Sequence, residues 1–383
     1  MRFNADGTFA WLQEHEAWAL AGIVFLGANK VAIAGDGGAV ATPVSVRVYD
    51  TETGALIWAR QAGGGRVVTD ARSYTPQLAV DASGNLMVLA SDQGDYVVIR
   101  FDNDGNPLPT WRFQVDAQNN VLATAIVSLP DGGAVITGRV GDEGGGSTGG
   151  NVTVRLDANG IPVFTDIQMP TPLFGVFTFG VAHLGVDNDG NITVAAAREI
   201  GATIAQVWKV SSTGVRLWTT YLPDPPPGVG TTINGFALSA NGNPLIALGK
   251  GGDLGFELVR LDGATGAVLS DTKAPVDGVA QTVAVAKNGR ILLGGFGTDF
   301  DGAHAYGPMA EFTENGEFCR VAENAGIFGS IKAGADANGW RVLGVTHYLD
   351  GVGNKASVSQ FDSEGACTLT DSVFVDGFEA EAP

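Results

Sequence analysis

The stretch VDASGNLMVLASDQGDYVVIRFDNDGNPLPTW, residues 80–111, holds two Gly turns among short apolar runs. Each turn, ASGN and NDGN, sets Asp or Asn beside Gly. Asp and Asn side chains bond their own backbone, and Gly adopts a positive φ without steric cost. The runs on either side of the turns are rich in Val, Ile and Leu. The stretch therefore predicts β-strands joined by hairpin turns.

The second turn of this stretch recurs along nearly the whole chain. Its copies read RFNADG, RVYDTETG, RFDNDG, RLDANG, KVSSTG, RLDGATG, EFTENG and QFDSEG, and they close on Gly at positions 7, 54, 105, 160, 214, 266, 316 and 365. The shortest interval is 47 residues (7 to 54) and the longest is 55 (105 to 160). A period of this size marks a repeat fold, in which each repeat is one supersecondary unit.

The first turn recurs in seven copies, from FLGANKVAIAG at residues 25–35 to ADANGWRVLG at residues 335–344. Each full repeat therefore predicts four strands in the order a, turn, b, loop, c, turn, d. Strand b is uniformly apolar, so we expect it to be buried on both faces. Strand c alternates, as in Val98-Ile99-Arg100-Phe101. No stretch keeps a period of about 3.6 residues, so we expect almost no helix.

These repeats predict an all-β protein, a β-propeller of four-stranded antiparallel blades. A four-stranded sheet has two faces and two edges to cover, and radial repetition covers the faces and shortens the edges. A β-solenoid is the rival architecture, but its repeats are shorter and its strands are parallel. A repeat of about fifty residues with hairpin turns favours the propeller.

The blade count follows from where the repeats begin. Residues 1–16 contain only strands c and d, so the sequence predicts an N-terminal half blade followed by seven complete blades from about residue 17 to 372. That makes eight positions; the alternative is a seven-bladed ring. We expect one propeller domain over residues 1–372 and an acidic tail over residues 373–383. We also expect the missing half blade, and a leader for export, to lie upstream of Met1.

Composition excludes several classes of partner. The net charge is −19, with a pI near 4.4, so nucleic acid and acidic membrane surfaces are repelled. No apolar run reaches the roughly 18 residues of a membrane helix, so no membrane span is expected. The two cysteines, Cys319 and Cys367, form no CxxC and no zinc-type cluster. They form either a disulfide or two free thiols.

Three segments carry a family resemblance. VRVYDTETGALIWARQA at residues 46–62 resembles the pyrroloquinoline-quinone-type propeller repeat, with an aromatic residue, Asp, Thr-Gly and a closing Trp. FELVRLDGATGAVL at residues 256–269 follows this plan without the Trp, and VAVAKNGRILLGGFG at residues 283–297 resembles the bacterial delta-sixty type of repeat. The resemblance implies that the family's stacking residues pack between adjacent blades. Their positions are taken by Trp11, Trp58, Trp111, Trp218 and Phe164.

The resemblance implies a fold rather than a reaction. The family contains quinone-cofactor dehydrogenases and cofactor-free scaffolds, and the dehydrogenases carry adjacent cysteines beside the cofactor. This chain has no adjacent cysteines, so we expect no quinone and no other cofactor. Its tail VFVDGFE, residues 373–379, is similar to a short ending of some exported bacterial proteins. We therefore expect an extracellular or periplasmic protein.

The candidate ligand-binding residues lie on loops. In a propeller the a-b and c-d turns emerge on one face, and the b-c and d-a loops emerge on the other. Here the loops are the longer and more irregular set, as at residues 141–150 and 222–230, and function concentrates on such loops. The b-c loops of the last two blades carry Asp299, Asp301, His304 and Tyr306, and then His347, Tyr348 and Asp350.

Carboxylates and imidazoles that converge at one rim can bind a metal or act as acid and base. As separate solvated loop residues they would do neither. The two DNDGN turns, at residues 102–106 and 187–191, resemble calcium loops but lack the distal Glu, so we expect plain hairpin turns. No GxSxG, HExxH or P-loop motif is present.

The sequence thus favours an exported, non-enzymatic binding or scaffold propeller. Its partner would be a protein, a peptide or a glycan, recognised through the loop-rich face. No catalytic residue is predicted, and the metal content is left open. The alternative is an enzyme, either a lyase or hydrolase or a degenerate quinoprotein, with its site at the mouth of the central channel.

Overall fold

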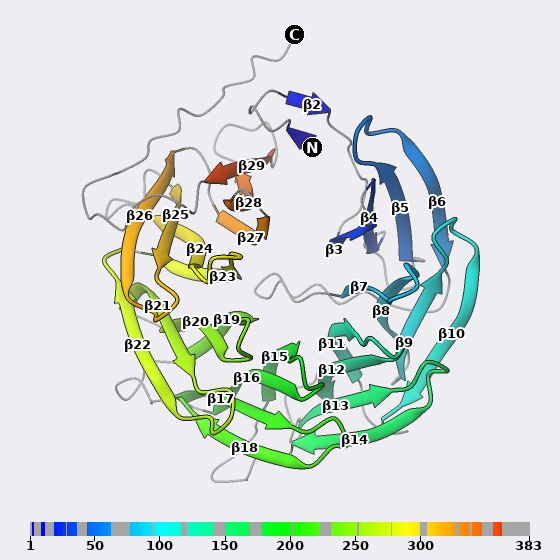
Figure 1. The fold of residues 1–383 in the computed structure, drawn as a ribbon, viewed down its shortest axis with the longest axis horizontal. Helices are drawn as coiled ribbons and strands as arrows, with labels where there is room; N and C mark the ends of the chain where they lie inside the picture. The colour runs from blue at the N-terminus through cyan, green and yellow to red at the C-terminus, as the bar shows by residue number, and fades with distance from the viewer. Residues whose placement is uncertain are drawn as a thin grey trace. The chain divides into compact units, whose positions relative to one another are not determined.

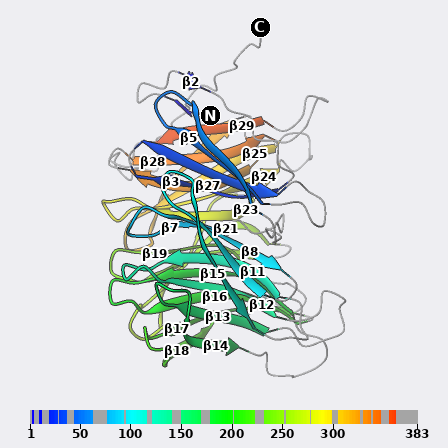
Figure 2. The ribbon, with the colours of Figure 1, turned by 90° about the vertical axis from the view of Figure 1, so that its right-hand side faces the viewer.

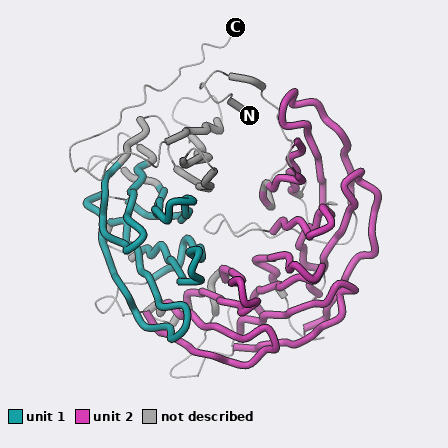
Figure 3. Tube along the Cα trace, in the orientation of Figure 1, with its two compact units in different colours: residues 1, 229–383 teal, residues 2–228 magenta. Residues whose placement is uncertain are grey.

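The computed structural model describes most of the chain as strands and tight turns. There are 29 strands and no helix among the described residues. The chain divides into two compact units, residues 2–228 and residues 1 and 229–383 (Figure 3). The described segments are 2–3, 9–11, 19–27, 29–36, 44–62, 77–92, 95–115, 121–140, 150–168, 178–200, 202–222, 231–250, 253–276, 278–298, 305–325, 329–336, 339–346 and 355–361.

The unit of residues 2–228 starts with the predicted hairpin, β1 (Arg2–Phe3) and β2 (Phe9–Trp11). Four antiparallel sheets of four strands follow, which we number as blades 1 to 4 (Figure 1). Blade 1 contains β3 (Ala19–Leu26), β4 (Lys30–Asp36), β5 (Val44–Asp50) and β6 (Leu56–Ala62); blade 2 contains β7 (Leu78–Val80), β8 (Leu86–Asp92), β9 (Asp95–Phe101) and β10 (Pro107–Gln114). Blade 3 contains β11 (Val121–Ser128), β12 (Ala134–Val140), β13 (Gly150–Leu156) and β14 (Pro162–Gln168); blade 4 contains β15 (Thr178–Val186), β16 (Ile192–Ile200), β17 (Ala202–Val210) and β18 (Arg216–Tyr221).

The second unit holds three further blades. A single parallel bridge, Gly255 with Val279, joins the sheets of blades 5 and 6. Three strands of blade 7 are described; the fourth, predicted after Gly365, lies outside the described residues. Blade 5 contains β19 (Thr231–Leu238), β20 (Pro244–Lys250), β21 (Asp253–Leu261) and β22 (Val268–Ala274); blade 6 contains β23 (Val279–Val285), β24 (Ile291–Thr298), β25 (Ala305–Phe312) and β26 (Phe318–Ala325); blade 7 contains β27 (Gly329–Asp336), β28 (Gly339–Thr346) and β29 (Lys355–Phe361).

The turns have the predicted chemistry. In the turn that joins β9 to β10, Gly105 has a φ of 81°. The Asp102 carboxylate accepts hydrogen bonds from the backbone N–H groups of Asp104 and Asn106, at 2.9 and 2.8 Å, and from Asn106 Nδ2 at 2.8 Å. Asp187 makes the same bonds to Asp189 and Asn191. Both DNDGN sequences are therefore hairpin turns whose carboxylates are occupied by the turn itself.

Burial falls from the inner strands to the outer strand of each blade. Strand b is buried as predicted, and in β8 only Asp92 is partly exposed. The alternation of strand c does not mark a solvent face, since in β13 every residue except Arg155 is buried. Sheets stacked face to face cover both sides of strands b and c. The outer strand has one side open to solvent, and in β14 no residue is buried.

Aromatic residues of the outer strands pack between adjacent blades, as the resemblance implied. The Trp58 ring lies against Gly105 of blade 2, the Trp111 ring against Gly160 of blade 3, and the Phe164 ring against Gly214 of blade 4. Figure 1 shows the strands that carry these rings, β6, β10 and β14, outside the inner strands of their own blades. Trp218 is buried too. The side chain of Trp11 lies outside the described part.

Cys319, in β26, is disulfide-bonded. The other cysteine of the sequence, Cys367, lies outside the described residues. Of the two alternatives that the sequence left open, the disulfide is the one found. The described residues contain no helix long and apolar enough to cross a bilayer.

Candidate functional site

The loop cluster predicted on the last two blades is not tested by the structure. Tyr306 belongs to β25, where its backbone pairs with Gly297 and Ala325. Among the described residues, no group of three or more His, Cys, Asp or Glu side chains could hold a metal ion. The remaining members of the cluster lie outside the described residues: Asp299, Asp301, His304, His347, Tyr348 and Asp350.

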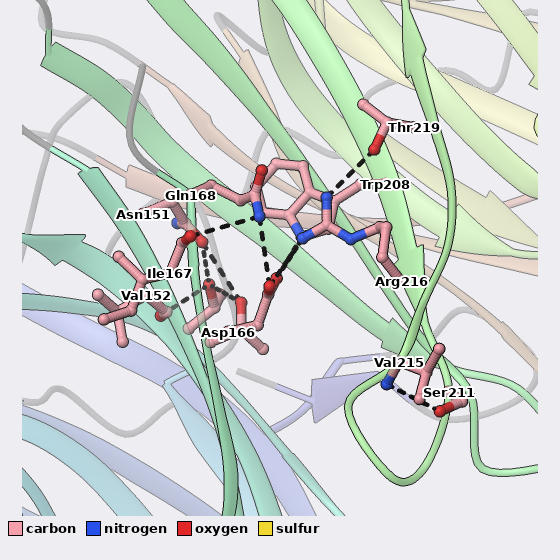
Figure 4. Close-up of polar contacts among 12 residues, drawn as sticks. Asn151, Val152, Asp166, Ile167, Gln168, Trp208, Ser211, Val215, Arg216 and Thr219 are labelled. Carbon is pink, nitrogen blue, oxygen red and sulfur yellow. Dashed lines mark hydrogen bonds and ion pairs between the residues drawn. The ribbon is translucent and has the colours of Figure 1, made fainter. Parts of the chain in front are cut away.

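The described residues bring a different polar cluster together, between blades 3 and 4. We call it the seam; it lies where one face of blade 3 (β11–β14) packs against one face of blade 4 (β15–β18). In Figure 2 the strands of blades 3 and 4 overlap in the lower half of the view. Figure 4 shows the polar contacts across the seam. Its main polar residues are Thr124, Thr137, Asn151, Thr153, Asp166, Gln168, Trp208 and Arg216.

The deepest part of the seam is a triad of neutral polar side chains. Thr137, Asn151 and Thr153 are fully buried, at 0% exposure. Asn151 Oδ1 lies 3.1 Å from Thr137 Oγ1 and 3.3 Å from Thr153 Oγ1, and the two hydroxyls lie 3.1 Å apart. Asn151 Nδ2 is buried without a hydrogen-bond partner. Thr124 Oγ1 donates to the Ala182 carbonyl at 3.1 Å and so ties β11 to β15 of the next blade.

The outer part of the seam is a charged cluster centred on Asp166. The Arg216 Nη2 group donates to both carboxylate oxygens of Asp166, at 2.8 and 2.6 Å. Trp208 Nε1 donates to Asp166 Oδ2 at 3.1 Å, and Gln168 Nε2 lies 3.3 Å from Oδ1. The guanidinium of Arg216 lies 5.7 Å from the Trp208 ring centroid. This carboxylate is therefore fully engaged in joining the two blades.

The seam ends next to a loop that the sequence singled out. Asn151 pairs with Arg139 on one side and with Gln168 on the other, so the three form one row across blade 3. The row lies at the strand ends that flank residues 141–149. On blade 4, Gln206 pairs with Tyr221. This pair lies two residues beyond the Trp208–Thr219 pair, toward the loop end of blade 4. Hydrogen-bonding side chains thus line both sides of the seam at its loop end.

The described groups of the seam are hydrogen-bond donors and acceptors that are mostly engaged with one another. Its carboxylate is held by a guanidinium and an indole, so it is not available as a general base. Its hydroxyls, on Thr137 and Thr153, bond to an amide and to each other, with no imidazole or lysine beside them in the described residues. The amides can both donate and accept hydrogen bonds, which suits recognition of a polar ligand.

Residues 2–161 match the family described as outer membrane protein assembly factor BamB. These residues are PQQ-like β-propeller repeats. The predicted resemblance to such repeats is confirmed, and the matched segment ends in the turn between β13 and β14. No curated protein matches the chain.

Solved structures confirm the predicted fold class. An ulvan lyase, described as the structure of a new polysaccharide lyase family, superposes with a TM-score of 0.57 at 13% identity, covering 92% of this chain and 94% of that one. The Dos1 propeller gives 0.55 at 14% identity, covering 97% and 84%. Hydrazine synthase of Kuenenia stuttgartiensis gives 0.56 at 13% identity, covering 92% and 99%. At such identities the similarity shows the fold alone, an all-β propeller.

Sequence reasoning missed the seam because its residues are scattered over six strands, with one or two on each. The signal that could have found it is polar side chains inside the apolar strands b and c. Thr137, Asn151 and Thr153 stand where β8 and β9 of blade 2 carry mostly Val, Leu and Ile.

Proposed function

We propose that this chain is an exported, non-enzymatic binding propeller that recognises a protein, peptide or glycan through its loop-rich face. One observation carries the proposal. At the loop end of the seam an amide donor has no hydrogen-bond partner, whereas the carboxylate of the seam is already bonded. Asn151 Nδ2 has no partner, while Asp166 accepts from Arg216, Trp208 and Gln168. A site with spare donors and no free acid or base is suited to binding.

Two observations support export. Cys319 is disulfide-bonded, and disulfides persist in oxidising compartments such as the periplasm and the cell exterior. The family that matches residues 2–161 is named for an outer membrane assembly factor. We propose the same kind of location for this chain. We also propose that residues 1–372 form one domain, with residues 373–383 as its tail.

The second candidate is an enzyme, a lyase or hydrolase or a degenerate quinoprotein, with its site at the mouth of the central channel. One neighbour by fold is described as a polysaccharide lyase bound to a glucuronate-containing sulfated saccharide, which makes acidic polysaccharides the first substrates to assay. Incubation of the full chain with acidic polysaccharides, followed by size analysis of the products, tests this candidate. We expect no shortening of the chains; catalytic shortening would replace the binding proposal.

The binding proposal is tested with the immobilised full chain and a panel of peptides, neutral glycans and acidic glycans. Replacing residues 141–149 by a Gly-Ser linker of equal length should remove the captured ligand. The control is Asp189→Ser, in an exposed hairpin turn at the opposite ends of the strands, and it should leave capture unchanged. Capture that survives the loop replacement, or no capture from the whole panel, would refute the proposal.

A further inference from the structure

A cation without a partner among the described residues stands at the loop end of the seam. Arg139 pairs directly with Asn151 across β12 and β13, so the two side chains leave the same face of the sheet about 5 Å apart. Arg139 is partly exposed. No hydrogen bond or ion pair joins its guanidinium to any residue that the structure describes. The net charge of −19 repels large polyanions, but a guanidinium that no described carboxylate neutralises attracts a small anion locally.

The amide of Asn151 adds a second donor at the same place. Its Oδ1 atom is directed to Thr137 and Thr153, so the Nδ2 atom on the same carbon is directed away from them. That Nδ2 atom is fully buried and unpartnered. A buried donor left unsatisfied costs about 1–3 kcal/mol. An acceptor that reaches it recovers that free energy.

The remaining polar side chains of the row offer neutral contacts. Gln168 continues the row on blade 3, and Gln206 and Tyr221 lie on the facing side of blade 4. The Tyr221 side chain is 58% exposed, so its ring presents a flat apolar surface with a hydroxyl at its edge. Amides match hydroxyl groups well, because both donate and accept.

We infer that the loop end of the seam binds the carboxylate of an acidic glycan, an inference that rests on the proposed function. Arg139 pairs with the carboxylate and Asn151 Nδ2 donates to one of its oxygens. Gln168 and Gln206 bond ring hydroxyls, and the Tyr221 ring covers the C–H face of a sugar. Asn151 is buried in the unliganded chain, so binding of the carboxylate to Nδ2 requires neighbouring side chains to move, as side chains do on a fast timescale.

A glycan fits these groups better than a peptide does. An extended peptide gains its affinity by adding its backbone to an exposed strand edge. The donors at this site are side chains inside a seam between two sheets, and they are mostly amides. Such groups suit a ligand whose own surface alternates hydroxyls with an apolar ring face.

The test measures binding of a galacturonate trisaccharide to the full chain by calorimetry. Two comparison ligands are measured in the same way. One is the methyl ester of the trisaccharide, which has a similar shape without the charge, and the other is a glutamate tripeptide. We expect the acidic trisaccharide alone to bind. Arg139→Gln should weaken that binding at least about tenfold, the loss of one charge-assisted bond. Asn151→Asp should weaken it similarly by repulsion.

Arg112→Gln is the matched control. Arg112 also lies near the loop end of its blade, but Asp92 and Asp95 already hold it at 2.6 and 3.2 Å, so binding should be unchanged. Asn151 is buried, so its variant could lose binding through a loss of stability, and the melting temperature of each variant is measured first. The effect of Arg139→Gln, at a partly exposed position, is the result that tests the inference. Binding unaffected by Arg139→Gln, or equal binding of the ester or of the tripeptide, would overturn the inference. If the trisaccharide fails to bind while the loop-replacement experiment still removes another captured ligand, this inference falls and the proposed function stands.

Discussion

The indole of Trp111 lies so close to Gly160 that a methyl group on this glycine would come within 2.2 Å of the ring. Trp111 lies in β10, the outer strand of blade 2, and Gly160 belongs to the c-d turn of blade 3. The glycine therefore serves two purposes at once: it takes a φ of 80° and it leaves room for the neighbouring blade. Trp58 with Gly105 and Phe164 with Gly214 repeat the arrangement.

Replacing Gly160 by Ala should cost more than the backbone strain alone. Gly190 is the matched control, because its φ is 76° and a methyl group there would meet only Ser212, at an ordinary 3.5 Å. Gly190→Ala should cost about 1–2 kcal/mol. Gly160→Ala should cost a further 1–3 kcal/mol or so from overpacking. Equal losses in urea unfolding would show that the ring moves aside freely.

Trp111→Ala should lower the free energy of unfolding by about 3–5 kcal/mol, the usual range for an aromatic residue removed from a core. It also removes the contact with the Arg100 guanidinium, which lies 4.1 Å from the ring centroid. Trp111→Phe should cost much less, since blade 3 uses Phe164 at this position. Circular dichroism during thermal unfolding measures both variants.

Acid should weaken the Lys209–Asp187 pair of blade 4, whose charged atoms lie 2.7 Å apart. Burial alone would raise the pKa of Asp187, but the bonds from Lys209 and Asn191 outweigh it and hold the pKa below its usual 3.8. A lowered folded-state pKa contributes stability above the unfolded-state pKa and loses it as the pH falls through the folded value. The contribution should therefore be full at pH 7, start to fall near pH 4 and be lost once the pH is below the folded-state pKa.

Asp187→Asn tests this pH dependence. The variant should unfold more easily at pH 7, by about 3 kcal/mol, because it leaves the buried Lys209 without its counter-ion. The difference from the parent protein should shrink as the pH is lowered through the acid range. A difference that is independent of pH would assign the loss to the hairpin turn instead of the ion pair.

Glu311 should be the most sensitive charged residue of blade 6. It is 3% exposed and accepts from Arg290 at 2.7 Å and from Arg320 at 2.5 Å. Glu311→Gln should cost about 3 kcal/mol, because two partly buried cations lose their counter-ion. Glu317→Gln, at an exposed position of the next turn, should change stability by less than about 0.5 kcal/mol. Chemical denaturation measures the free energy of unfolding of both variants, and equal losses would contradict this prediction.

The disulfide at Cys319 should contribute about 2–4 kcal/mol. Cys319→Ser is expected to melt at a lower temperature than the parent, and a reducing agent should lower the melting temperature of the parent alone. If the reducing agent affects both proteins equally, its effect comes from elsewhere in the chain.

Much of the fold could be predicted because its cause is local. An Asp or Asn beside a Gly such as Gly105 bends the chain by bonds within four residues, so the turns and the strands between them follow from short windows of sequence. The inter-blade packing of Trp58 could be predicted because one outer-strand position repeats. The burial of strand c could not be predicted, because the alternation of apolar and polar residues does not say what covers each face of the strand.

The candidate site was harder to predict because its residues meet across blades. Asp166 and Arg216 are fifty residues apart and lie on different sheets, and no local period relates them. Loops attract attention in a sequence because they are irregular, whereas Asn151 is one polar residue inside an apolar strand. Only the stacking of blades 3 and 4 shows that its amide, with Arg139 beside it, faces a row of hydrogen-bonding groups.

The pairing of a ring from one repeat with a glycine from the next bears on how such a gene can grow. The repeats of blades 2 and 3 each carry one half of such a contact at each end, a glycine in the c-d turn and a ring in the outer strand. Duplicating a whole repeat in tandem therefore inserts a new glycine for the preceding ring and a new ring for the following glycine. Contacts such as that of Trp111 with Gly160 are therefore kept between each blade and the next after the insertion. Lengthening by whole repeats needs no compensating substitution at the joints, whereas lengthening by half a repeat leaves a ring or a glycine unmatched.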